Sequence, residues 1–213
     1  MRFLTKWRNK EKKGRVVVLL DLENLYRNIS LNWFDNFSLT TALKVILERL
    51  RDTGEIVGIF AFSPRHILFR PYQKFFIKQG IYLLLCPKIT TEKEPRIPPR
   101  LGTQRRRIPR TIAPPIEPKE EVKDTTDPTL ISFGKMLLRE IPGLTHLCIG
   151  SGDADYLELV DKAKSKGVKV IVVAGDRHSL SADLARKADW DPKRHEKAVW
   201  ILSELQRPET PNL

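Results

Sequence analysis

Residues 16–24 read VVVLLDLEN, and residues 144–174 read LTHLCIGSGDADYLELVDKAKSKGVKVIVVA. These stretches contain three short apolar runs, each of a length typical of a fully buried strand. In the second stretch, a polar turn and a segment with helical spacing separate two such runs, and Gly167 ends the helical segment. A strand, a helix and a further strand in this order predict a parallel sheet covered by helices.

The rest of the chain continues this alternation. The predicted strands cover residues 16–20, 56–62, 81–86, 144–149 and 168–174. Residues 21–24 are predicted as a turn, and the predicted helices cover residues 39–53, 71–79, 127–140, 153–166, 181–188 and 193–204. The fold class is therefore α/β, with a mainly parallel five-stranded sheet in the order 2-1-3-4-5 or 3-2-1-4-5. In the second order, the first and fourth strands are neighbours at the point where the order reverses.

The excess positive charge is concentrated in two segments. The chain has 213 residues and a net charge of +12, of which residues 1–15 contribute +6 and residues 87–115 contribute +6. Clustered Lys and Arg gain affinity for a polyanion by releasing counterions from its phosphates, so we expect nucleic-acid contact. The alternatives are a solvated tail and loop, or an anionic membrane surface for the first segment. The expected RNA-binding residues are Arg100, Arg105, Arg106, Arg107 and Arg110.

Composition also divides the chain. Residues 1–14 form a basic tail, residues 15–190 a domain, and residues 191–213 a C-terminal helix and tail. A Pro/Arg-rich insertion at 87–118 holds eight of the fifteen prolines, and it has too few large apolar residues to bury a core face.

The sequence shows no membrane-spanning segment, no secretory signal and no cysteine pattern typical of disulfides. No apolar run approaches the roughly 18 residues of a membrane-spanning helix, and the first residues do not resemble a secretory signal. Cys86 and Cys148 lie in apolar runs, so we expect buried, reduced thiols and a cytoplasmic protein. The sequence leaves homo-oligomerisation open.

Acidic residues recur at one edge of the predicted sheet. Asp21 follows the first strand, Asp153 follows the fourth, and Asp127 begins a helix that starts from the same edge. Each of them also has a simpler interpretation, as a helix cap or the start of an Asx-turn. Carboxylates that converge repel one another, and a hard divalent cation such as Mg²⁺ or Mn²⁺ removes that cost. A cation there, beside the basic segments, predicts metal-dependent hydrolysis of a phosphodiester.

Other catalytic arrangements are poorly supported. An aspartate nucleophile at Asp21 would suit a phosphatase, but the acidic partner expected two residues later is replaced by Glu23. Ser151 has no neighbouring base in the sequence. The four histidines are scattered, and with the two cysteines they show no zinc-ligand spacing; they are His66, His146, His178 and His195.

The sequence resembles the NYN domain family, which are PIN-like nucleases. The opening D-x-x-N of that family matches Asp21-Leu-Glu-Asn24, and its S-G-D-x-D-(F/Y) turn matches residues 151–156. The helix and the K-V-I-V-V strand that follow also match, as does the closing pattern, represented here by Ser179, Leu184, Ala188 and Asp189. The middle motif, usually Lys-Gly-x-Asp, corresponds to Lys123-Asp-Thr-Thr-Asp127, which leaves Asp127 and Asp124 as rivals.

The resemblance implies a PIN-like three-layer fold with strand order 3-2-1-4-5 and a metal-dependent endoribonuclease activity. It implies that Asp21, Asp127 and Asp153 hold Mg²⁺ or Mn²⁺, with Asp155 as a supporting catalytic residue. Asn24 and Ser151 would orient the substrate, which is RNA. The departure in the middle motif favours an alternative: a catalytically vestigial module that binds RNA or a protein on the same fold.

Overall fold

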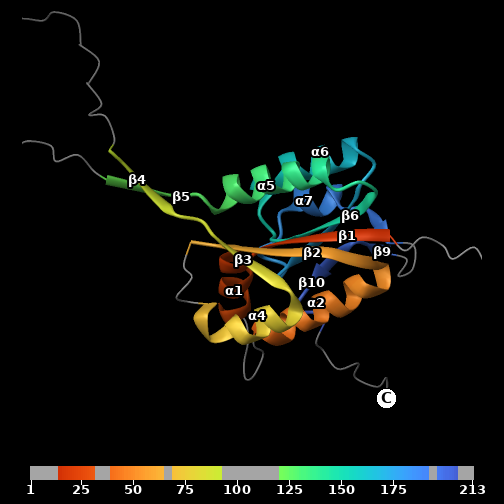
Figure 1. Ribbon diagram of the computed structural model, residues 1–213, viewed down its shortest axis with the longest axis horizontal. Coiled ribbons are helices and arrows are strands. Elements are labelled where there is room, and N and C mark those ends of the chain that lie inside the picture. Colours follow the sequence, from red (N-terminus) through yellow and green to blue (C-terminus); the bar gives the residue numbers. More distant parts are fainter. Residues whose placement is uncertain (1–13, 32–38, 65–68, 93–119, 192–195, 206–213) are drawn as a thin grey trace, which may run out of the picture.

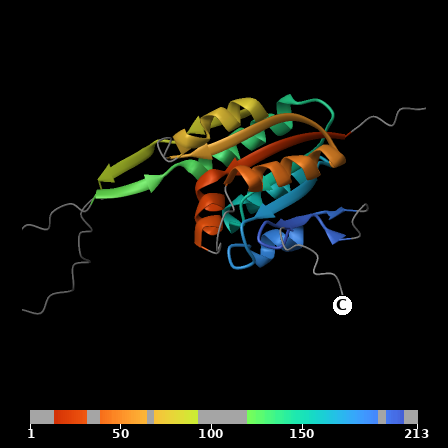
Figure 2. The same ribbon diagram turned by 90° about the horizontal axis from the view of Figure 1, so that it is seen from below.

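The computed structural model describes residues 14–31, 39–64, 69–92, 120–191 and 196–205, and it shows three layers with a twisted sheet between two layers of helices (Figures 1 and 2). The sheet contains β1 (Gly14–Asp21), β2 (Gly54–Ser63), β3 (Ile81–Leu85), β6 (Leu144–Gly150), β7 (Lys169–Ala174) and β10 (Val199–Ile201). The first helical layer contains α1 (Leu22–Leu31), α2 (Leu39–Thr53), the short 3-10 helix η1 (Arg70–Tyr72) and α4 (Gln73–Gln79). The second contains α5 (Thr126–Glu140), η2 (Ala154–Tyr156), α6 (Leu157–Ser165) and α7 (Ala182–Lys187).

The observed sheet has six strands rather than the five that the sequence predicts. Their order is β10-β7-β6-β1-β2-β3, and every pair of neighbours is parallel. β1 pairs with β6 on one side, and Leu20 lies opposite Gly150. The two strands that precede Asp21 and Asp153 are therefore neighbours, and the order reverses between them.

β1 joins the two halves of the core because its side chains alternate between the two faces of the sheet. Val16, Val18 and Leu20 pack with the α1, α2 and α4 layer. Val17 and Leu19 pack with α5, α6 and α7. The five residues from Val16 to Leu20 have no exposed surface, as expected for a central strand covered by helices on both faces.

The predicted helix over residues 193–204 is wrong. Within the described part of this segment, Val199–Ile201 is the edge strand β10, parallel to β7, and Glu196–Lys197 is the short strand β9, which pairs with β8 (Trp190–Asp191). Trp200 and Ile201 are buried, with 1% and 8% of their surface exposed. The apolar spacing fits either a helix or a strand, and the free edge of β7 favours the strand because β10 completes its hydrogen bonding.

Two local predictions near the sheet edge also need correction. Residues 22–24 are not a turn, because α1 begins at Leu22, directly after β1. Asp127 is not the residue that caps α5: the helix begins one residue earlier, at Thr126, with Thr125 in the capping position. The Asp127 carboxyl group is therefore available to contact groups outside the helix.

The predicted insertion also begins with regular structure. β4 (Lys88–Glu92) pairs with β5 (Glu120–Asp124) in an antiparallel ribbon that projects from the body of the molecule (Figure 1). The rest of the insertion lies outside the described residues, as does the basic segment before residue 14. Cys86 and Cys148 are buried and form no disulfide, as predicted. None of the helices in the described part of the chain has the length and apolar character needed to cross a membrane.

Candidate active site

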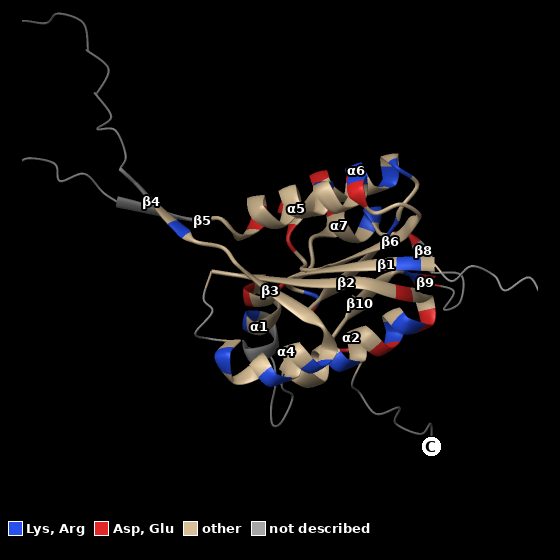
Figure 3. Cartoon of the chain, viewed as in Figure 1, with Lys and Arg blue, Asp and Glu red and all other residues tan. Residues whose placement is uncertain are grey.

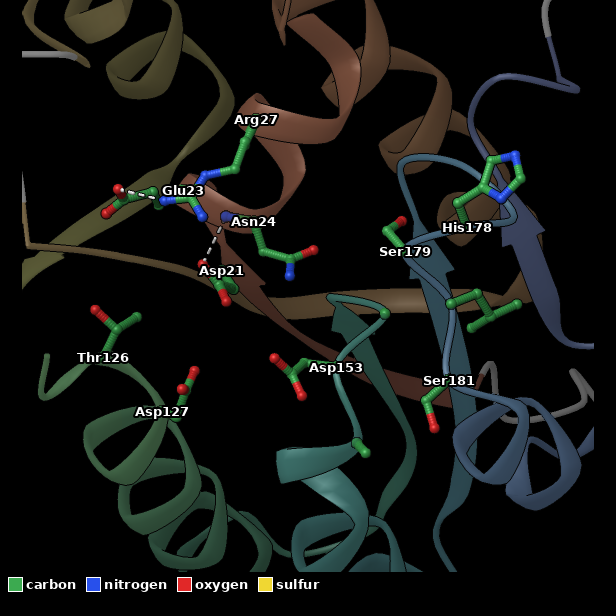
Figure 4. Close-up of a pocket in the computed structure, with 13 residues that line it drawn as sticks. Asp21, Glu23, Asn24, Arg27, Thr126, Asp127, Asp153, His178, Ser179 and Ser181 are labelled. Carbon is green, nitrogen blue, oxygen red and sulfur yellow. Dashed lines mark hydrogen bonds and ion pairs between the residues drawn. The ribbon is translucent and has the colours of Figure 1, made fainter. Parts of the chain in front are cut away.

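A pocket of about 560 Å³ opens at the carboxyl edge of the sheet, beside the ends of β1 and β6. This is the position where open α/β sheets bind ligands, because the crossover helices diverge at the strand-order reversal. Side chains from β1, α1, α5 and two loops line it, as Figure 4 shows. The lining includes Asp21, Asn24, Arg27, Asp127, Asp153 and His178.

Asp21 is the last residue of β1, and only 6% of its surface is exposed. Its Oδ1 accepts a 3.0 Å hydrogen bond from the backbone N–H of Asn24, which satisfies one of the free donors at the start of α1. Its Oδ2 accepts a 3.0 Å hydrogen bond from the hydroxyl group of Tyr156. The two oxygens of this carboxyl group therefore have separate partners, one in the backbone and one in the site.

The Tyr156 hydroxyl group links Asp21 to Asp127. It lies 2.5 Å from Asp127 Oδ1, and its side chain has no exposed surface. Burial is the main cause that raises the pKa of Tyr156, and the charge of Asp21 raises it further. The phenol therefore keeps its hydrogen at neutral pH, but a phenol has only one hydrogen to donate. It cannot donate to both carboxylates at once, so the phenol alone does not balance the negative charge of the two side chains.

Asp153 faces the same space from the loop after β6 (Figure 4). Its Oδ1 accepts a 3.1 Å hydrogen bond from the backbone N–H of Asp155, which caps η2. The loop is held closely against a second loop: the N–H of Ser181 donates to the carbonyl group of Gly152 at 2.7 Å. A Cβ atom at Gly152 would lie 2.0 Å from the carbonyl oxygen of Ser179, so only glycine fits this contact. This packing fixes where the Asp153 carboxyl group points.

The donor set suits a partly hydrated divalent ion. Asp21, Asp127 and Asp153 all turn toward one space (Figure 4), and carboxylate oxygens are the ligands that Mg²⁺ and Mn²⁺ prefer. No group of three His, Cys, Asp or Glu side chains among the described residues is gathered closely enough to hold an ion directly. Mg²⁺ commonly uses one or two carboxylates and keeps several waters, so the residues fit an open site of that kind.

A second loop and the first turns of α1 form the other walls. In residues 176–181, the N–H of Ser179 donates to Asp176 Oδ1 at 2.7 Å, which fixes a tight turn. This turn carries the exposed side chain of His178 to the rim of the pocket. On α1, Arg27 lines the pocket and forms an ion pair with Glu23 at 3.2 Å. The pocket therefore has acidic side chains within it, with the Arg27 guanidinium group and the His178 imidazole ring at its rim.

Four of the predicted site residues line the pocket, and others do not. Asp21, Asn24, Asp127 and Asp153 lie in the lining. Ser151 differs from the expectation: its side chain is fully buried, and its Oγ accepts the Asp153 N–H at 3.3 Å, so it supports the loop instead of facing a substrate. Asp155 is exposed and does not line the pocket.

Further predicted residues fall at the margins. Asp124, the rival of Asp127, is the last residue of β5. The expected RNA-binding arginines lie outside the described residues; they are Arg100, Arg105, Arg106, Arg107 and Arg110.

Sequence reasoning missed several residues of the pocket. Arg27 follows Glu23 by four residues, which is the spacing of an ion pair on one helix face, but residues 21–24 were expected to be a turn. His178 has no ligand spacing in the sequence, and it reaches the rim only because the 176–181 turn packs on Gly152. Thr126 and Ser181 also line the pocket, and no motif in the sequence distinguishes them.

Comparison with known proteins supports the same fold. A match to the NYN domain covers residues 15–191. A crystal structure of a protein of unknown function from Vibrio parahaemolyticus is similar, with a TM-score of 0.55 and 18% sequence identity over 90% of this chain and 93% of that one. At that identity the likeness concerns the fold alone. No curated protein matches the sequence. NYN domains have a PIN-like fold and are generally nuclease-like, and because the match covers most of its length, this chain belongs to the NYN domain family.

Proposed function

We propose that this protein is an endoribonuclease that cleaves RNA phosphodiester bonds with a divalent cation, Mg²⁺ or Mn²⁺, held by aspartates. One observation carries the proposal: carboxyl groups from three separate elements turn into one pocket at the strand-order reversal. These are Asp21 at the end of β1, Asp127 in the first turn of α5 and Asp153 in the loop after β6. Membership of a nuclease-like family supports the same conclusion.

The charge balance of the pocket supports a bound cation. Two carboxylate oxygens lie 3.0 and 2.5 Å from one phenol oxygen, and the phenol supplies a single hydrogen. Two carboxylates that share one phenol lie close enough to repel each other, and a divalent cation bound between them offsets that repulsion. Held by Asp21, Asp127 and Asp153, such an ion would supply a water activated for attack and would stabilise the charge that develops on the phosphate.

The chain's own residues have the complementary tasks. Asp153 is the exposed member of the acidic set, so it is the one most accessible to a cation and to a substrate phosphate. Asn24 brings an amide group to the pocket, which can donate to a phosphate oxygen or a ribose hydroxyl group. Arg27 lines the pocket, where its positive charge attracts a phosphate beside the cleaved bond, and His178 at the rim brings an imidazole ring that can form a hydrogen bond to the substrate.

Cleavage by matched variants tests the proposal. The protein is incubated with end-labelled single-stranded and structured RNAs, with Mg²⁺, with Mn²⁺ or with a chelator. We expect internal cleavage products that require the cation and that Asp153→Asn abolishes, while RNA binding by this variant persists. The control is Asp161→Asn, an exposed α6 residue paired with Lys187 at 2.5 Å, and we expect it to cleave normally. Metal-dependent cleavage by Asp153→Asn at the normal rate would contradict the assignment.

A second candidate function is a binding module without catalysis. Two observations favour it: the middle motif departs from the family pattern at Lys123–Asp127, and no three metal-binding side chains in the described residues are gathered around one point. Such a protein would bind the RNA panel with or without the cation and leave every substrate intact. The same assay therefore separates the two functions.

A further inference from the structure

Positive charge is segregated within the folded body, although the body as a whole is neutral outside its two basic segments. Residues 56–91 contain five Lys or Arg and no Asp or Glu. This stretch forms most of β2, then η1, α4 and β3. The sheet edge formed by β3, and the helical segments before it, therefore have basic residues and no acidic residues in their sequence.

Three of these basic residues form a row. Arg70, Lys74 and Lys78 recur every fourth residue along η1 and α4, and all three are exposed. Lys74 and Lys78 are four residues apart in α4, so they lie on the same face about 6 Å apart along the helix axis, and Arg70 precedes them in the 3-10 helix η1. We call Arg70, Lys74 and Lys78 the basic row. Among the described residues, no member of the row forms an ion pair.

The basic row begins next to the residue that packs against α1, the helix that contributes Arg27 to the pocket. The ring of Tyr26 on α1 packs edge-on against the ring of Phe69 at 5.8 Å. The next residues in the chain are Arg27, which lines the pocket, and Arg70, which begins the row. Figure 3 shows the basic segments of α1 and of the start of α4 at the same end of the molecule. The pocket, Arg27 and the basic row thus follow one another along one side of the domain.

Resting on the proposed function, we infer that the basic row binds the backbone of single-stranded RNA as the strand leaves the acidic pocket past Arg27. Regularly spaced cations match the repeating phosphates of an extended strand, and the flexible strand can follow the helix surface. Such contacts carry no base-specific information, so the row supplies affinity and direction to the substrate, not sequence preference. All three residues belong to η1 and α4, outside the insertion in the sequence.

The test measures binding in a protein that does not cleave. Arg70→Gln, Lys74→Gln and Lys78→Gln are combined in the Asp153→Asn variant, and binding of a fluorescent oligouridylate is measured over a range of salt concentrations. The control combines three exposed lysines of α6 and the start of β7, Lys162→Gln, Lys164→Gln and Lys169→Gln, which changes the net charge equally; of these, Lys164 pairs with Asp189 at 3.5 Å. Thermal melting of both variants establishes that they remain folded.

We expect the row variant to bind about tenfold or more weakly at low salt, and its plot of log affinity against log salt to be less steep by about 2 units. The control should change far less on both measures. Equal losses in both triple variants would overturn the inference, since general charge alone would then explain binding. A normal salt slope in the row variant would overturn it as well.

This result is independent of whether the protein cleaves RNA. If the wild-type protein cleaves nothing but the row variant loses binding, the catalytic proposal fails and the binding surface stands. If the wild-type protein cleaves with metal but the row variant binds like its control, only the inference about the row fails.

Discussion

Removing the hydroxyl group of Tyr156 tests the geometry on which the site depends. The Tyr156→Phe substitution keeps the buried ring, which has no exposed surface, and deletes the donor that lies 3.0 Å from Asp21 Oδ2 and 2.5 Å from Asp127 Oδ1. A hydrogen bond to a charged group contributes about 1.5–3 kcal/mol, so we expect the free energy of unfolding to fall by about 2 kcal/mol. For a chain of this size, that corresponds to a fall in Tm of about 4–8 °C.

Thermal melting with and without Mg²⁺ measures this effect. Without the hydroxyl group, the two carboxylates lose a common donor and repel each other more strongly, so added Mg²⁺ should raise the Tm of the variant more than that of the wild type. The control is Tyr82→Phe, because Tyr82 is 65% exposed and stacks on Phe60 through its ring. If Tyr156→Phe melts at the wild-type temperature, the hydroxyl group does not bridge the two aspartates and the charge argument for a cation loses its basis.

Three further predictions concern the same site. Asp127→Asn should abolish cleavage, because Asp127 lines the pocket and contacts the Tyr156 hydroxyl group, and Asp124→Asn, at the end of β5, should leave cleavage at the wild-type rate; a cleavage assay with both variants decides which acid belongs to the middle motif. Gly152→Ala should lower both the Tm and cleavage, since its Cβ would lie 2.0 Å from the Ser179 carbonyl oxygen; an unchanged Tm in a melting experiment would contradict this close approach. The folded state holds the Tyr156 pKa above its ordinary value of 10.0, so the folded state binds more protons at high pH and stability falls as pH rises above 10. The free energy of unfolding of the wild type should fall by about 1.4 kcal/mol per pH unit from this cause, and Tyr156→Phe should show no such fall. Denaturant titrations above pH 10 should therefore show a smaller stability difference between wild type and variant than at neutral pH.

The central part of the sheet was predictable because its strands are fully buried. The continuous apolar runs of β1, β6 and β7 predict buried strands better than a helix face or a loop. Their alternation with helices predicts a parallel sheet but leaves two strand orders open, and the pairing of β1 with β6 decides between them. The edge strand β10 could not be predicted from a continuous apolar run. β10 has only three residues, and its identity as a strand depends on the free edge of β7, a tertiary feature absent from local sequence.

The site was predictable to the extent that its acids are attached to strand ends. Asp21 and Asp153 follow two neighbouring strands, so the topology alone places them together. The residues contributed by packing between loops were not predictable. His178 and Ser181 reach the pocket because the loop containing Gly152 lies against the 176–181 turn, a contact between segments that share no spacing pattern.

The aspartates of the pocket can cap helices and also face a cation site, because the two oxygens of one carboxyl group can have different partners. Asp21 Oδ1 accepts the Asn24 N–H and Asp153 Oδ1 accepts the Asp155 N–H, so each carboxyl group caps a helical turn with one oxygen. The second oxygen of Asp21 meets the Tyr156 hydroxyl group within the site. A cap holds the carboxyl group in one orientation. The side chain therefore loses less conformational entropy when a cation binds to it. Asparagine caps a helix nearly as well as aspartate but lacks the charge, so an Asp→Asn variant changes the chemistry of the pocket while retaining the local fold, which alanine would not.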